Sequence, residues 1–152
     1  MVASTVERVR RHTSAAANRA VMHEIAASVR WHAAHPEGID RRLQELDREW
    51  DVERTLEANA STLAFTGVVL GATVDKRWLA LPAMVTAFLF QHAVHGWCPP
   101  LPILRRLGFR TAREIDTERY ALKALRGDFG PIGPGPHDQD SRASHALQAA
   151  RL

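Results

Sequence analysis

Two uninterrupted apolar runs in the middle of the chain dominate its pattern of hydrophobic and polar positions. Asn59–Val74 and Trp78–Trp97 contain no charged residue, and only Asp75-Lys76-Arg77 separates them. As helices, the first run would be about 24 Å long and the second about 30 Å. These lengths approach the thickness of a hydrocarbon core, roughly 30 Å. The pattern therefore predicts an all-α protein with a transmembrane helical hairpin over residues 58–98.

Particular residues in the runs fit this interpretation. Trp78 and Trp97 bracket the second run, where amphipathic rings would lie at the two interfaces. Gly67 and Gly71 form a GxxxG pattern in the first run, which allows close approach between helix backbones. We expect these glycines to pack helices together and to support self-association, most simply as a homodimer.

The alternative to a membrane hairpin is a pair of core helices in a soluble bundle. Such helices usually carry polar residues along one face. After Asn59, which opens the first run, the polar residues of the two runs are few, and all are formally uncharged: Ser61, Thr62, Thr66, Thr73, Thr86, Gln91, His92 and His95. The composition of the runs favours the membrane over the soluble core.

Basic residues flank the hairpin on both sides. The arginines near its two ends are Arg41, Arg42, Arg48, Arg54, Arg105, Arg106, Arg110 and Arg113. The loop contributes only Lys76 and Arg77, partly offset by Asp75. The positive-inside rule then predicts a multi-pass membrane protein with both termini in the cytoplasm and the tight loop outside.

The remaining chain divides into four segments around the hairpin. Residues 1–38 are helix-forming, and residues 39–57 are predicted to form one amphipathic helix. An interfacial turn and a C-terminal helix follow over residues 99–126. Residues 127–152 are rich in Gly, Pro and polar residues, so a disordered tail is expected.

The amphipathic segment 39–57 has one apolar stripe. Its members, at spacings of four, three and four, are Ile39, Leu43, Leu46 and Trp50. Such a stripe would mediate a dimer or lie flat on lipid. The last predicted helix is introduced by Thr111-Ala112-Arg113-Glu114, which has the spacing of a capping box.

Charge and cysteine content exclude several classes of protein. The net charge of +3 suits an anionic membrane surface as well as nucleic acid. No basic stripe with interleaved aromatic residues is present, so nucleic acid is not an expected partner. The single cysteine, Cys98, rules out an intramolecular disulfide.

The candidates for chemistry lie together at the end of the second run. His92, His95 and Cys98 are spaced one helical turn apart. They lack a fourth ligand, so we expect no metal and interpret the histidines as a polar helix-end cluster. As a reactive thiol, Cys98 would be followed by Arg105 seven residues later, with no glycine between Cys98 and Arg105 to present backbone N–H groups. No catalytic residue and no cofactor are predicted.

The residues that resemble a known family are Glu53-Arg54 and Asn59 before the first run and Gly96, Cys98 and Pro99 after the second. This pattern resembles the YgaP-like inner-membrane transmembrane domain, a bacterial family of largely unknown function. The resemblance covers roughly residues 52–108. Some members carry a rhodanese domain for sulfur transfer; we expect none here, because the single cysteine, Cys98, lies at the end of the second run.

These observations favour a non-enzymatic membrane scaffold or partner-binding module, with the lipid bilayer and an unidentified protein as partners. One alternative is a thiol-dependent sulfur or redox accessory protein that acts through Cys98. Another is a soluble helical bundle that binds a protein or nucleic acid. No catalytic motif supports an enzyme.

Overall fold

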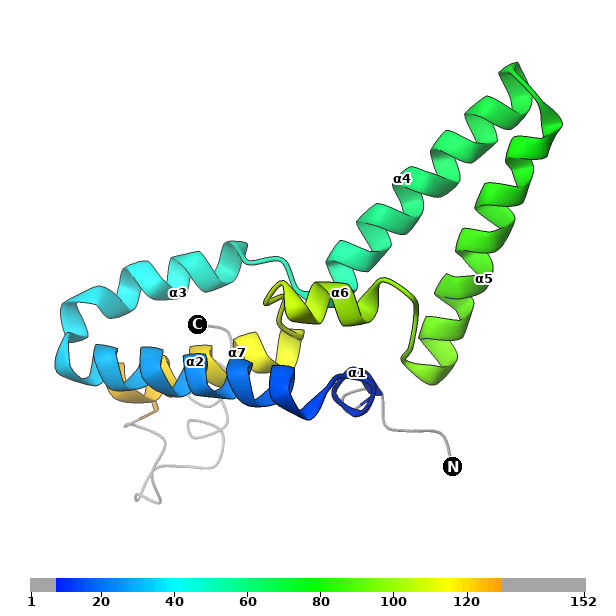
Figure 1. Ribbon diagram of the computed structural model, residues 1–152. Coiled ribbons are helices and arrows are strands. Elements are labelled where there is room, and N and C mark those ends of the chain that lie inside the picture. Colours follow the sequence, from blue (N-terminus) through cyan, green and yellow to red (C-terminus); the bar gives the residue numbers. More distant parts are fainter. Residues whose placement is uncertain (1–7, 130–152) are drawn as a thin grey trace, which may run out of the picture. The chain divides into compact units, whose positions relative to one another are not determined.

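The computed structural model describes residues 8–129, and within them it contains helices but no strands. The elements are α1 (Arg8–Arg11), α2 (Ala15–Ala34), η1 (Pro36–Gly38), α3 (Ile39–Arg48), α4 (Val52–Thr73), η2 (Lys76–Leu79), α5 (Ala80–His95), α6 (Leu101–Arg106) and α7 (Ala112–Arg126) (Figure 1). The all-α prediction is confirmed. The predicted tail beyond Phe129 lies outside the described residues.

The chain forms two compact units. In the part that the structure describes, the first unit contains residues 8–23 and 49–115. The second contains residues 24–48 and 116–129.

A break interrupts the amphipathic helix that was predicted over residues 39–57. α3 ends at Arg48 and α4 begins at Val52, so the predicted boundaries are wrong here. Asp51 has an extended backbone, and its side chain accepts a hydrogen bond of 2.7 Å from the Arg54 N–H. Because a side-chain acceptor of this kind caps a helix N-terminus, Asp51 starts a new helix in the middle of the expected one.

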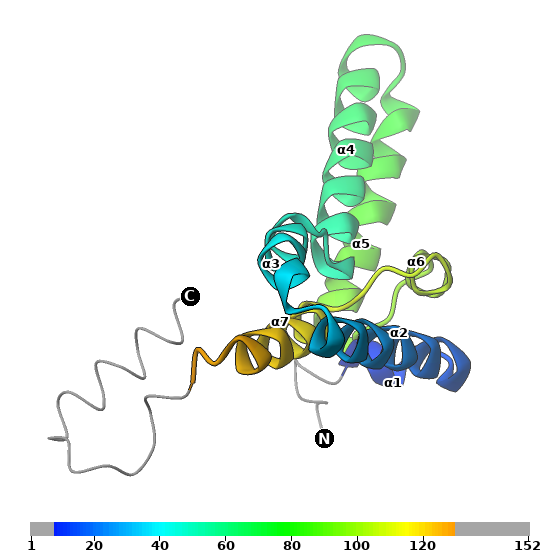
Figure 2. The same ribbon diagram turned by 90° about the vertical axis from the view of Figure 1, so that its left-hand side faces the viewer.

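The two apolar runs form an antiparallel hairpin of α4 and α5, which lie side by side in two perpendicular views (Figures 1 and 2). Asp75 caps the short η2 turn through the Arg77 N–H at 2.7 Å. The η2 turn includes Trp78 and Leu79, the first two residues of the second apolar run. α5 therefore begins at Ala80 and contains 16 residues. Among residues 8–129, no helix combines the length and apolar character needed to cross a membrane. The predicted hairpin forms, and its first helix begins at Val52, six residues before the predicted start.

Gly67 and Gly71 lie inside the hairpin, in contact with η2 and α5. A Cβ atom on Gly67 would stand 2.4 Å from Pro82 Cδ, and one on Gly71 would stand 2.6 Å from Leu79 Cδ2. The close approach predicted for the GxxxG pattern thus occurs within one chain. Because both glycines are buried there, they do not present the dimer surface expected from the sequence.

Replacing Gly67 with alanine should loosen the hairpin. Alanine favours a helix by about 1 kcal/mol over glycine, but the added methyl collides with a rigid proline ring. We expect a net loss of about 1 kcal/mol or more in the free energy of unfolding, measured by urea denaturation. Ser61→Ala, at an exposed site on the same helix, is the control. Equal stability of the two variants would contradict the close contact.

The core of the first unit lies at the base of the hairpin, away from its turn. Its buried residues, with Phe109 packed against them, are Val9, Val52, Leu56, Cys98, Leu101 and Leu104. α1, the first turns of α4, and α6 thus share one core with Cys98. The Val52 N–H also donates to the Arg110 carbonyl at 2.9 Å, which ties the start of α4 to the segment before α7.

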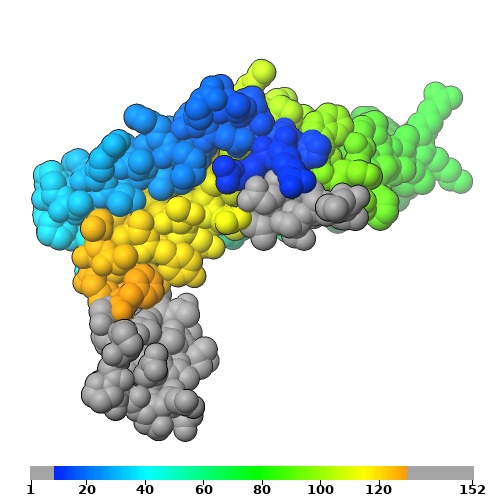
Figure 3. Space-filling model, turned by 90° about the horizontal axis from the view of Figure 1, so that it is seen from below, coloured from blue at the N-terminus to red at the C-terminus, as the bar shows by residue number. Residues whose placement is uncertain are grey.

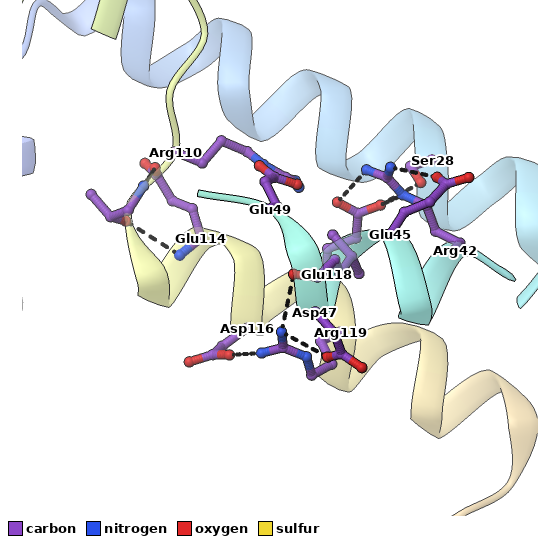
Figure 4. A network of polar contacts seen from close by, with 12 residues as sticks. Ser28, Arg42, Glu45, Asp47, Glu49, Arg110, Glu114, Asp116, Glu118 and Arg119 are labelled. Carbon is purple, nitrogen blue, oxygen red and sulfur yellow. Dashed lines mark hydrogen bonds and ion pairs between the residues drawn. The ribbon is translucent and has the colours of Figure 1, made fainter. Parts of the chain in front are cut away.

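A buried ion pair stabilises the same unit. Arg105 donates from both terminal nitrogens to Glu114, at 2.7 and 2.8 Å, and the two residues are 2% and 4% exposed. The Thr111 N–H donates to Glu114, and the Glu114 N–H donates back to the Thr111 hydroxyl, so the predicted capping box is confirmed (Figure 4). Burial raises the pKa of Glu114, but the hydrogen bonds from Arg105 and Thr111 outweigh it and lower that pKa overall.

A second buried carboxylate stabilises the other unit. Glu118 is fully buried on α7 and accepts hydrogen bonds from Arg42 on α3, at 2.9 and 3.2 Å, and from Ser28 on α2, at 2.6 Å (Figure 4). The surfaces of α2 and α7 touch in the space-filling view (Figure 3).

The apolar stripe of α3 is buried in this second unit. Ile39, Leu43 and Leu46 are all buried, whereas Trp50, the fourth residue of the predicted stripe, lies outside the helix and is exposed. The stripe is therefore used within the chain. It is not free to form a dimer or to lie on lipid, the two roles expected from the sequence.

Candidate functional site

Glu53 and His92 meet at the base of the hairpin. Glu53 lies in the first turn of α4 and His92 in the last turn of α5, and the antiparallel arrangement brings these two helix ends together. Glu53 Oε2 and His92 Nε2 are 2.8 Å apart. His92 is only 3% exposed, while one third of the Glu53 side chain is accessible. A charged carboxylate therefore holds one nitrogen of a buried imidazole.

The other nitrogen of His92 faces a different environment. His92 Nδ1 is buried and has no well-formed hydrogen bond among the described residues. The Cys98 thiol nevertheless lies close enough to interact with the ring. Interaction with Cys98, and then with Glu53, raises the pKa of His92 to about 9, although burial opposes this shift.

An apolar pocket of about 200 Å³ adjoins this group. Its lining comes from α4, from α5 and from the segment that follows α5: Leu56, Asn59, Ala60, Leu63, Val85, Phe88, Leu89, His92, Cys98, Pro99 and Pro100. Of the lining residues with a nitrogen or sulfur atom in the side chain, His92 and Cys98 are buried and Asn59 is exposed.

The structure brings together some of the predicted residues and separates others. His92 and Cys98 share the pocket, but His95 is exposed and does not line it. Gly96 ends α5 with a φ of 78°, a left-handed conformation that favours glycine, and its N–H donates to the His92 carbonyl at 2.7 Å. Within residues 8–129, no cluster of three His, Cys, Asp or Glu side chains is arranged to hold a metal ion.

Glu53 was not predicted as a site residue. The sequence assigned it only to the charged approach to the first run. The signal that would have identified it is the short loop between the runs, which forces an antiparallel hairpin. The start of the first helix then lies beside the end of the second helix, and His92 is the first histidine of the second apolar run.

Stability should fall at alkaline pH because of His92. A pKa raised from 6.5 to about 9 means that the protonated ring stabilises the fold fully below pH 6.5 and loses this effect as the pH rises to 9. The free energy of unfolding should drop by up to about 1.4 kcal/mol per pH unit in this window. Denaturation at pH 6, 7.5 and 9 measures the slope. The slope should vanish in His92→Gln and persist in His95→Gln. An unchanged slope in His92→Gln would show that another titratable group causes the pH dependence.

Comparison with known proteins identifies no relative. No family model, no curated protein and no solved structure matches this chain. The resemblance of residues 52–108 to YgaP-like domains therefore stays a prediction.

Proposed function

We propose that this protein is a non-enzymatic membrane-bound module whose distal hairpin, residues 60–90, is immersed in lipid. The observation that carries the proposal is the inverted distribution of side chains in the hairpin. Gly67 and Gly71 lie at the contact between the helices, and several large apolar side chains, among them Phe65, Met84 and Phe90, point outward. Helices packed in membranes use small residues at their contacts, because lipid is as good a solvent for large apolar side chains as a protein core.

The outward side chains are strongly exposed. Phe65 and Phe90 are 71% and 72% exposed, and Met84 is 53% exposed. Two helices can bury only one side of each other, and a helix that is apolar all round requires cover on its remaining sides. A patch of this kind marks a surface that contacts lipid or another protein.

Hydroxyl groups on the hairpin favour lipid over a polar partner. Each of these threonines donates to the carbonyl four residues earlier, at 2.7 or 2.8 Å: Thr62, Thr66, Thr73 and Thr86. Such bonds satisfy the hydroxyls inside their own helices. Because lipid offers no hydrogen-bond partner, internal satisfaction is a requirement for residues immersed in it.

The base of the hairpin has the character of a membrane interface. Trp50 is half exposed with the Arg54 guanidinium 4.5 Å from its ring centroid, and Ile103 and Leu107 on and after α6 are 60% and 70% exposed. Aromatic, basic and apolar side chains of this kind occur together at headgroup level. Arg54 then lies on the cytoplasmic side of the inner membrane, and the η2 turn reaches toward the opposite headgroups.

The thiol-dependent alternative has one observation in its favour, the imidazole beside Cys98. Two others oppose it. Cys98 is only 4% exposed, and Pro99 and Pro100 follow it with no N–H group to stabilise an oxyanion. We therefore assign the buried group at the hairpin base a role in structure or binding, without catalysis.

Vesicle flotation tests the membrane proposal. Purified protein is mixed with vesicles of phosphatidylcholine and phosphatidylglycerol and centrifuged through a density gradient, before and after a carbonate wash. We expect the protein to float with the vesicles and to resist carbonate. Protein that stays at the bottom, or that forms a discrete oligomer with a buried hairpin in the absence of lipid, would contradict the proposal.

A further inference from the structure

The first unit carries an excess of positive charge, and the second unit does not. Residues 8–23 and 49–115 contain eleven Lys and Arg against six Asp and Glu, whereas residues 24–48 and 116–129 contain seven against eight. A charge asymmetry of this kind indicates that one part of a protein binds an anionic partner. The first unit, which includes the hairpin, is therefore the part to which such a partner would bind.

Two of the arginines that follow the hairpin do not supply this charge. Arg105 and Arg110 are both buried, and they form ion pairs with Glu114 and Glu49. Their charges are therefore compensated inside the protein. The charge that a partner can reach has to come from other residues of the unit.

The N-terminal segment of the unit supplies accessible charge. Residues 8–23 contain four arginines and two histidines but no Asp or Glu. Arg11 and Arg19 are exposed, and Arg10 is partly exposed. Among residues 8–129, none of these three side chains forms an ion pair or a hydrogen bond with another residue. They are available to an anionic partner.

Asn18 fixes this segment beside α6. Its side-chain nitrogen donates to the Arg10 carbonyl at 3.0 Å, and its side-chain oxygen accepts from Arg105 at 3.1 Å. Val9 also packs into the same core as Leu101. α1, the start of α2 and α6 therefore lie together at the base of the hairpin, at the end opposite the η2 turn (Figures 1 and 2).

Apolar side chains accompany the charge on α6. Arg106 is exposed, and Ile103 and Leu107 on either side of it are largely exposed. Basic residues beside exposed aliphatic side chains are typical of helices that lie on an anionic membrane. Proteins that bind single-stranded nucleic acid instead place aromatic rings among their basic residues, and residues 8–23 contain no Phe, Trp or Tyr. The composition favours anionic lipid over nucleic acid.

We propose that Arg10, Arg11, Arg19 and Arg106 form a basic surface that binds the anionic headgroups of a phospholipid bilayer, such as those of phosphatidylglycerol. The partner is the bilayer of the proposed function, on which this inference rests, because an immersed hairpin holds its own base at headgroup level. Each arginine near an anionic bilayer increases the partition coefficient about fivefold. Three arginines therefore contribute about a 100-fold gain.

Flotation of the full chain at a series of lipid concentrations measures this preference. The lipid concentration that floats half of the protein is determined for vesicles of phosphatidylcholine alone and for vesicles with about one third phosphatidylglycerol. At low salt, we expect half-flotation at a lipid concentration at least 100-fold lower when phosphatidylglycerol is present. In 0.5 M NaCl, which screens the charges, this ratio should fall below threefold. A ratio below threefold at low salt would overturn the proposal.

A charge-removing variant and a charge-preserving variant test the named residues. The combined Arg10→Gln, Arg11→Gln and Arg19→Gln variant should need about 100-fold more lipid with phosphatidylglycerol and the same amount, within twofold, with phosphatidylcholine alone. The combined Arg10→Lys, Arg11→Lys and Arg19→Lys variant keeps the charge and should behave as the wild type. Equal losses in the glutamine and lysine variants would show that the arginines act on folding, and would overturn the proposal.

The matched control removes the same charge from the second unit. Arg30, Arg41 and Arg48 are exposed there, and their combined replacement by glutamine should leave the preference for phosphatidylglycerol within threefold of the wild type. A loss as large as that of the first glutamine variant would show that only the net charge matters, and would overturn the basic surface. Removal of the protein from the vesicles by a DNA duplex, at a phosphate concentration equal to that of the lipid, would assign the surface to nucleic acid and would also overturn the proposal.

Failure of this inference is distinguishable from failure of the membrane proposal. A protein that floats with both kinds of vesicle at the same lipid concentration would refute the basic surface and leave the immersed hairpin intact. A protein that floats only with phosphatidylglycerol, and that 0.5 M NaCl releases, would refute the immersed hairpin and leave the basic surface intact.

Discussion

Replacing Glu114 with glutamine should lower the free energy of unfolding by about 3–5 kcal/mol. The substitution leaves the Arg105 guanidinium, which is 2% exposed, without the charge that compensates it. Arg105 keeps its hydrogen bonds to the Phe109 carbonyl and to the Asn18 side chain, but neither acceptor carries a negative charge. Urea denaturation followed by circular dichroism measures the loss.

Glu45→Gln is the matched control for this prediction. Glu45 pairs with Arg41 and Arg42, but half of its side chain is exposed, and surface pairs contribute at most about 1 kcal/mol. A double replacement of Arg105 by methionine and Glu114 by leucine should recover much of the stability, because it removes both buried charges. A Glu114→Gln variant as stable as Glu45→Gln would show that the pair is accessible to water.

Aspartate in the distal hairpin should abolish membrane binding. Phe65→Asp and Met84→Asp place one carboxylate on an outward face of each helix within the distal hairpin, where the wild-type side chains are 71% and 53% exposed. Each charge costs about 3 kcal/mol near the centre of a bilayer, or roughly a 100-fold drop in the partition coefficient. The double variant should therefore remain at the bottom of a flotation gradient.

The control for the hairpin variants is Leu125→Asp on α7. Leu125 is a large apolar side chain that is 45% exposed, so the change alters surface polarity without touching the hairpin. It should float as the wild type does. Loss of flotation in Leu125→Asp, or its retention in the double hairpin variant, would show that another surface binds the vesicles.

Local patterns predicted much of the helical structure. The charge-free runs with three polar residues between them led to the hairpin, and Thr111 to Glu114 led to the start of α7. Both depend on neighbours in the sequence: periodicity and length in one case, capping in the other. The close contact at Gly67 was also predictable, although its partner turned out to be in the same chain.

Other features depend on contacts between distant residues and were not predictable from local patterns. Arg42 and Glu118 are 76 residues apart in sequence, and nothing in either segment identifies the other as its partner. The helix break before Val52 was missed because the apolar spacing runs across it, while Asp51 and the Arg110 carbonyl favour a new start. The role of Glu53 emerges only when the two ends of the hairpin meet.

The central claim, that lipid surrounds the distal hairpin, is tested most directly by measuring immersion depth at Phe65. A nitroxide is attached to Phe65→Cys in a Cys98→Ser background, and its accessibility to oxygen and to a water-soluble nickel chelate is measured by electron paramagnetic resonance in vesicles. The same label at Arg54→Cys provides the interface reference. We predict high oxygen and low nickel accessibility at Phe65, with more nickel accessibility at Arg54; a label at Phe65 that nickel reaches as readily as at Arg54 would contradict the account.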